Sequence, residues 1–119
     1  MAATVLVVAA LFFAAMGTYA LVVPTRLTAP FDITLGSAVA RSEVRAVYGG
    51  FGWAIAVMLM VAVADPQLRA GIVITVAAAL AGMAAGRVLS ALDGRTAFYP
   101  NWFYFLVEII VAVALFSVA

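Results

Sequence analysis

Three ionisable side chains, Arg45, Arg87 and Glu108, interrupt stretches of sequence that are otherwise apolar. An ionisable group inside lipid is costly, so each must reach the headgroups or find a polar partner within the protein. At a rise of about 1.5 Å per residue, Arg87 and Glu108 lie about 9 Å inside the ends of their predicted helices. An arginine can extend over that depth, whereas a glutamate has a shorter stem. The sequence therefore predicts that Glu108 is paired with an arginine, protonated or hydrated in a cavity.

One predicted helix face gathers polar groups around Arg45. Arg41, Arg45, Tyr48 and Gly52 follow one another at positions i, i+4, i+7 and i+11, which lie on the same side of a helix. Together with Gly49, Gly52 gives a bare backbone that a neighbouring helix or a ligand can approach closely. This face therefore offers cations, a phenol and room for close contact.

A second polar face is predicted near the end of the chain. Asn101, Tyr104 and Glu108 stand at positions i, i+3 and i+7 of an apolar helix. Pro100 suits the first turn of that helix, and the surrounding aromatic side chains suit the headgroup region of a bilayer. We expect this face to meet Arg87 from the preceding helix.

The missing residue types close off several kinds of chemistry. The chain has no Cys, which excludes thiolate metal sites and thiol nucleophiles. It also has no His, the usual ligand of zinc and haem and the usual group for proton transfer near neutral pH. We therefore predict neither a metal site nor a cofactor. A net charge of +1 without a basic stripe also argues against nucleic acid as a partner.

Composition places the chain in a membrane. It is 69% hydrophobic and only 9% charged, with a mean hydropathy of +1.28, which is far more apolar than a soluble domain. The 119 residues have room for roughly four spans of about 20 residues each and little else. The prediction is an all-α integral membrane protein with a single transmembrane domain over residues 1–119.

Apolar runs and turn signals divide the chain into four helices and one long connection. The helices are predicted over residues 2–23, 38–63, 68–92 and 99–119, and Ser37 is a candidate cap for the second. The connection over 24–37 carries apolar side chains, so it lies on the membrane surface or folds over the bundle as a lid.

Short loops between four spans imply an up-down four-helix bundle with its polar groups at one end. Most arginines flank that end, and arginines in short loops usually stay in the cytoplasm. We expect a multi-pass protein of a bacterial inner membrane whose N- and C-termini both face the periplasm. The polar end comprises Tyr19, Arg41, Glu43, Arg45, Tyr48, Arg87, Asp93, Arg95, Asn101, Tyr104 and Glu108.

A family resemblance rests on a combination of short strings. Glu43 is followed by Arg-Ala-Val-Tyr-Gly-Gly over 45–50, then by Gly86-Arg87, Asp93-Gly94 and the late Glu108. This combination resembles a bacterial family of four-span membrane proteins catalogued as domain of unknown function 4345. The resemblance covers nearly the whole chain and implies a four-helix membrane domain. It implies no activity, so function must be argued from the residues.

Three functional hypotheses follow. In the first, the polar cluster binds the head of a membrane lipid or anionic amphiphile while the tail lies along Ala and Gly surfaces. In the second, the protein is a structural or assembly subunit, or a homo-oligomer, and the charges pin its helices together. In the third, Glu108 is the acid or base of an enzyme or proton-linked carrier. Whether the protein is an enzyme stays open, and no catalytic residue is predicted.

The first hypothesis assigns two groups of residues. The predicted ligand-binding residues are Arg45, Tyr48, Arg87, Tyr104 and Glu108, and the predicted supporting residues are Arg41, Glu43, Gly49, Gly52, Asp93 and Asn101.

Overall fold

A computed structural model describes all 119 residues, which form helices and connecting turns with no strand. Four helices are long and apolar enough to cross a membrane, and they span Ala2–Val22, Ala38–Ala64, Pro66–Ser90 and Phe98–Ser117. The predicted all-α, four-span fold is confirmed. In chain order the elements are α1 (Ala2–Val22), α2 (Pro24–Thr28), η1 (Ala29–Phe31), α3 (Ala38–Val44), η2 (Arg45–Gly50), α4 (Phe51–Ala64), α5 (Pro66–Ser90), η3 (Phe98–Trp102) and α6 (Phe103–Ser117).

The second span is one continuous helix made of α3, η2 and α4. The Ser37 hydroxyl accepts a hydrogen bond from the Ala40 amide at 3.1 Å, so the predicted cap is confirmed. Its middle segment, Arg45–Gly50, has π-helical geometry, and this is the Arg-Ala-Val-Tyr-Gly-Gly string itself. Such wider turns are uncommon and often occur at functional sites.

Glycines bring α1 and the second span into close contact. A Cβ built on Gly17 would lie 2.9 Å from the Gly49 carbonyl oxygen, and one built on Gly52 would lie 3.0 Å from the Phe13 carbonyl oxygen. No larger side chain fits without moving the backbone. The first hairpin of the molecule, formed by α1, α3, η2 and α4, is therefore held by backbone-to-backbone packing.

The second hairpin is formed by α5, η3 and α6. The Asp65 carboxylate accepts a hydrogen bond from the Gln67 amide at 2.9 Å, and Pro66 occupies the first turn of α5, where its missing amide costs nothing. Helix α5 therefore begins at Pro66 and not at residue 68 as predicted. The last span begins at Phe98, one residue before the predicted start.

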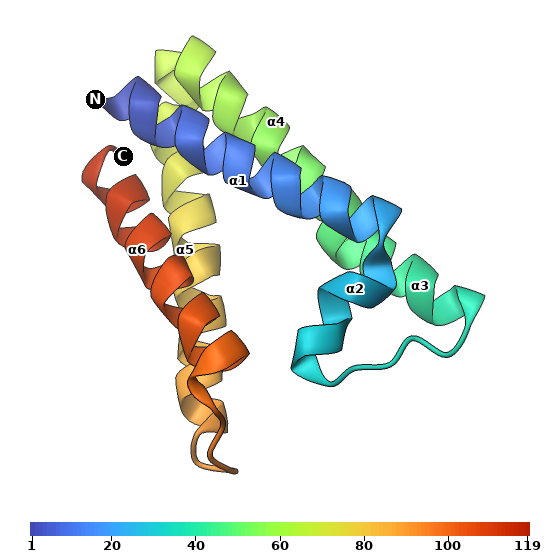
Figure 1. Cartoon of the computed structure of the whole chain (residues 1–119). Coiled ribbons are helices and arrows are strands. Elements are labelled where there is room, and N and C mark those ends of the chain that lie inside the picture. Colours follow the sequence, from blue (N-terminus) through green and yellow to red (C-terminus); the bar gives the residue numbers. More distant parts are fainter.

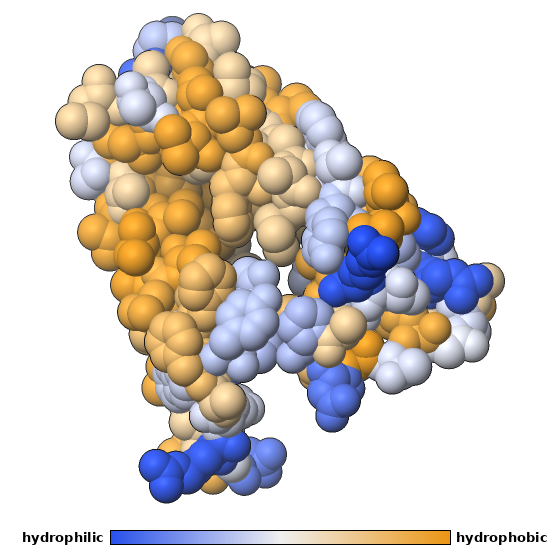
Figure 2. All heavy atoms as spheres, viewed as in Figure 1, coloured by the Kyte–Doolittle hydropathy of each residue, from blue (hydrophilic) through white to orange (hydrophobic).

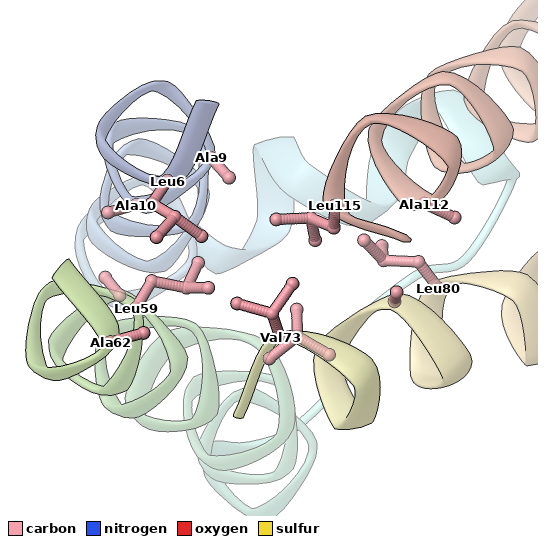
Figure 3. Close-up of a cluster of buried hydrophobic side chains, with 12 residues drawn as sticks. Leu6, Ala9, Ala10, Leu59, Ala62, Val73, Leu80, Ala112 and Leu115 are labelled. Carbon is pink, nitrogen blue, oxygen red and sulfur yellow. The ribbon is translucent and has the colours of Figure 1, made fainter. Parts of the chain in front are cut away.

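The two hairpins meet at the end that carries both termini and diverge toward the other end (Figure 1). The main hydrophobic core lies only where they meet, and Leu6, Leu59, Val73 and Leu115 point into its centre from four different helices (Figure 3). A smaller cluster of Ala20, Leu27 and Val44 lies within the first hairpin. No comparable cluster joins the hairpins at the divergent end, so their separation there is built into the packing.

The connection between the first two spans is folded. Residues 24–37 were expected to form an interfacial loop or lid, but Pro24–Thr28 forms the helix α2 and Ala29–Phe31 forms the short helix η1. Pro24 and Pro30 read as breakers in sequence, yet each stands in the first turn of its helix, where proline is well accommodated. Helix α2 and η1 lie on the side of the first hairpin that faces the second, and the rest of the connection leads back to α3 (Figure 1).

Candidate functional site

The centre of the candidate site is an ion pair between α5 and α6. The Arg87 guanidinium donates from Nε to Oε1 of Glu108 at 2.9 Å and from Nη2 to Oε2 at 3.0 Å. Two parallel bonds of this kind are the strongest geometry available to an arginine and a carboxylate. Of the three states predicted for Glu108, the structure shows pairing with an arginine.

Aromatic rings and an amide complete the surroundings of Arg87. Its guanidinium carbon lies 5.8 Å from the ring centre of Tyr104 and 5.9 Å from that of Phe31. The two rings are in contact, with centres 5.5 Å apart. The Asn101 Oδ1 accepts a further hydrogen bond from Arg87 Nη1 at 3.4 Å. One guanidinium is therefore held by a carboxylate, an amide and two ring faces.

The two charges differ in exposure. The side chain of Glu108 is 6% exposed, whereas that of Arg87 is 21% exposed. No buried side-chain nitrogen or oxygen lacks a hydrogen-bond partner. A carboxylate in an apolar helix is stable only with its partner, so the pair holds α5 to α6. Arg87 uses Nε, Nη1 and Nη2 once each in its hydrogen bonds, so each Nη keeps one N–H group for a further acceptor.

Arg45 belongs to a different arrangement. Its Nε donates to the Leu21 carbonyl oxygen at 2.9 Å, in the last turn of α1. A cation at the carboxyl end of a helix satisfies a free carbonyl and complements the helix dipole. Arg69 does the same at the other end of the molecule, where it donates to the Ala62 and Val63 carbonyl oxygens at 2.9 and 3.1 Å. Arg45 thus caps a helix of its own hairpin.

The structure brings together four of the predicted site residues, Arg87, Tyr104, Glu108 and Asn101, and leaves the others apart. Three of these, Tyr48, Glu43 and Asp93, are exposed, and Arg41 is partly exposed without an ion-pair partner. The two glycines, Gly49 and Gly52, are buried against α1 and do not face open space. Because Arg45 and Arg87 lie on different hairpins, they do not share a polar cluster.

Sequence reasoning missed Phe31. The sequence indicates only that residues 24–37 carry apolar side chains, yet the Phe31 ring in this segment contacts both Arg87 and Tyr104. The sequence offers one indication of this role, because Phe31 is a large aromatic residue in a short segment that is otherwise rich in turn-forming residues. With this contact, η1 touches η3 and the connection bridges the divergent ends of the hairpins.

A hollow separates the hairpins above this bridge. Figure 2 shows the opening between the apolar surface of α5 and α6 and that of α1, with hydrophilic side chains gathered at the divergent end. A surface groove of about 560 Å³ lies along α1 and is lined by residues such as Leu11, Ala15 and Val22. That groove contains none of the ion-paired side chains. A smaller hollow of about 310 Å³ includes Asn101 and lies at the turn between α5 and η3.

Comparison with known families identifies the chain. A family model described as domain of unknown function DUF4345 matches residues 1–119. The chain belongs to the DUF4345 family. Comparisons with curated proteins and with solved structures found no match. The family description gives no activity, so for this DUF4345 chain the functional argument depends on the site itself.

Proposed function

We propose that the protein binds a membrane lipid or another anionic amphiphile between its two hairpins. The polar head of that ligand contacts Arg87, Asn101 and Tyr104, and its tail lies in the apolar hollow. The observation that carries the proposal is the partly exposed Arg87, which is fixed by Glu108 inside a span at the end where the hairpins diverge.

The position of Phe31 supports the same proposal. Its ring lies against Arg87 and Tyr104, and it belongs to the short helix η1, which has no buried residue. A ligand head that replaced this ring would exchange a cation–π contact for a charge-assisted hydrogen bond, which is the stronger interaction. Phe31 therefore acts as a gate that leaves when the ligand enters.

The experiment is native mass spectrometry of protein extracted gently from its membrane, with identification of every lipid retained. Wild type should retain amphiphile in a fixed ratio, and the paired substitution Arg87→Met with Glu108→Leu should lose it. Replacing both charges leaves neither one buried alone, so the fold should persist. Arg69→Gln is the matched control because Arg69 also bonds from within a hairpin but lies at the other end. Retention that survives the paired substitution would contradict the proposal.

A specific observation favours a second function, that of an assembly subunit. Gly71, Gly82 and Gly86 lie on an exposed face of α5, and a Cβ built on any of them would meet no atom within 4 Å. Small residues at such spacing allow close contact with another helix. In the same spectra, a clean chain that travels with a fixed set of other subunits, and carries no lipid, would favour this function over lipid binding.

We also propose that the divergent end faces the cytoplasm of a bacterial inner membrane and both termini face the periplasm. Three arginines belong to elements of the divergent end, Arg26 in α2, Arg41 in α3 and Arg95 in the turn after α5, whereas Arg69 lies near the start of α5 at the other end. Since the chain has no cysteine, single cysteines can be added and labelled cleanly. Labelling of Leu92→Cys but not of Ala3→Cys from the cytoplasmic side supports this orientation, and the reverse result would overturn it.

A further inference from the structure

The hollow at the turn between α5 and η3 has its own chemistry. It has a volume of about 310 Å³, and its lining includes Ser90, Arg95, Thr96, Asn101 and Trp102. It begins where α5 ends, so it lies at the depth of the lipid headgroups, the level that an indole such as that of Trp102 prefers. The hollow thus places polar groups where a lipid carries its head.

The polar groups of this hollow are available as donors. The only ion pair in the structure joins Arg87 and Glu108. Arg95 therefore has no carboxylate partner, and even Asp93, two residues earlier, does not pair with it. Asn101 accepts from Arg87 through Oδ1, which leaves its amide NH₂ free to donate. The hydroxyls of Ser90 and Thr96 add two further donors. Such a set is suited to an acceptor that carries several oxygens.

Charge decides which acceptor fits. Glu108 neutralises Arg87, so that pair presents no net charge to a ligand. Arg95 is the one cation that lines this hollow, and a guanidinium with hydroxyl and amide donors has the chemistry to bind a phosphate oxyanion. Asn101 accepts from Arg87 and lines the same hollow as Arg95, but the two arginines differ, since Arg87 is bound to a carboxylate and Arg95 is unpaired.

We infer that this hollow binds the phosphate of a phospholipid head, with Arg95 as the cation and Ser90, Thr96 and Asn101 as the other donors. The inference rests on the proposed function and names its ligand class, an amphiphile whose head carries phosphate. It adds Arg95, Ser90 and Thr96 to the residues that recognise the ligand.

The test is a competition in mixed micelles between phosphatidylglycerol and diacylglycerol with the same acyl chains, read by native mass spectrometry as the ratio retained. Wild type should favour phosphatidylglycerol, and Arg95→Gln should lower that preference about tenfold, because a hydrogen bond to a charged group is lost. Thr96→Val should lower it less. Arg41→Gln is the matched control, since Arg41 lies at the same end without an ion-pair partner.

The outcomes separate the inference from the proposed function. An unchanged ratio in Arg95→Gln, or no preference in wild type, overturns the phosphate site while lipid binding stands. Retention of neither lipid by wild type overturns both. Added inorganic phosphate that displaces the bound phosphatidylglycerol shows that the hollow accepts phosphate from any source, and failure to displace it shows that the site requires the lipid-borne group.

Discussion

The two hairpins stabilise their polar side chains in opposite ways. In the first hairpin, Arg45 donates to the Leu21 carbonyl and Trp53 Nε1 donates to the Thr18 hydroxyl at 3.1 Å, while glycines seal the helix contact. In the second, Arg87 and Glu108 satisfy each other across two helices, and Arg87 stays partly exposed at the divergent end. An arginine that bonds to backbone carbonyls, such as Arg45, caps a helix. An arginine that is paired across two helices and partly exposed, such as Arg87, can also bind a ligand.

The largest expected effect comes from breaking the ion pair of the second hairpin on one side only. Arg87→Met alone should destabilise the protein by about 3–5 kcal/mol, because Glu108 is left buried without its partner. Denaturation in detergent, followed by circular dichroism, measures this loss. The paired substitution with Glu108→Leu should recover most of the stability. Equal stability of the single and paired variants would show that Glu108 does not depend on Arg87.

The next effect concerns the glycine contact of the first hairpin. Gly17→Ala should cost about 1–3 kcal/mol, because its new methyl group would meet the Gly49 carbonyl oxygen and force the helices apart. Gly82→Ala is the matched control in the second hairpin, where a Cβ meets nothing, and it should stabilise the helix by about 1 kcal/mol. The same denaturation assay applies. A neutral Gly17→Ala would mean that the first hairpin is not closely packed.

A smaller effect tests the bridge between the hairpins. Phe31→Ala removes the ring contacts with Tyr104 and Arg87, a combined loss of about 1–2 kcal/mol, and should let the divergent ends move further apart. Spin labels on Val39→Cys and Leu92→Cys, read by pulsed electron resonance, measure that separation. Phe116→Ala, which removes an exposed ring from the outer surface, is the control. An unchanged distance distribution would show that Phe31 does not hold the ends together.

The smallest effect should come from Arg45. Arg45→Gln removes one hydrogen bond to the Leu21 carbonyl, worth about 0.5–1.5 kcal/mol, and should loosen only the last turn of α1. Hydrogen exchange of the backbone amides near that turn measures the change. Lipid retention should match wild type. Loss of retention would return Arg45 to the ligand site and remove the contrast between the hairpins.

Much of the fold follows from the sequence because length and hydropathy alone specify four spans. Apolar runs of sufficient length and the cap at Ser37 placed the helices to within a few residues. Two prolines misled the interpretation of residues 24–37, because proline ends a helix in its interior but begins one in its first turn. The sequence alone does not distinguish these two positions without the neighbouring packing.

The site was less predictable for a geometric reason. Helix periodicity assigned Asn101, Tyr104 and Glu108 to one face, and the structure places all three around Arg87. Periodicity within a helix gives no information on how hairpins tilt, so the sequence did not separate Arg45 from Arg87. Helix periodicity also considers side chains alone, so it does not predict that the backbone carbonyl of Leu21 is the hydrogen-bond partner of Arg45. The role of Phe31 could not be predicted because its contacts with Arg87 and Tyr104 depend on how residues 24–37 fold.

The most direct test of the ligand site is photocrosslinking with a phospholipid that carries a diazirine near its headgroup, followed by mapping of the labelled peptides. Lipid bound between the hairpins should label the segments around Phe31 and Tyr104 in wild type and lose both signals in the variant that combines Arg87→Met with Glu108→Leu. Labelling concentrated on the groove along α1, around Leu11 and Val22, or unchanged in that variant, would contradict a ligand site at the ion pair.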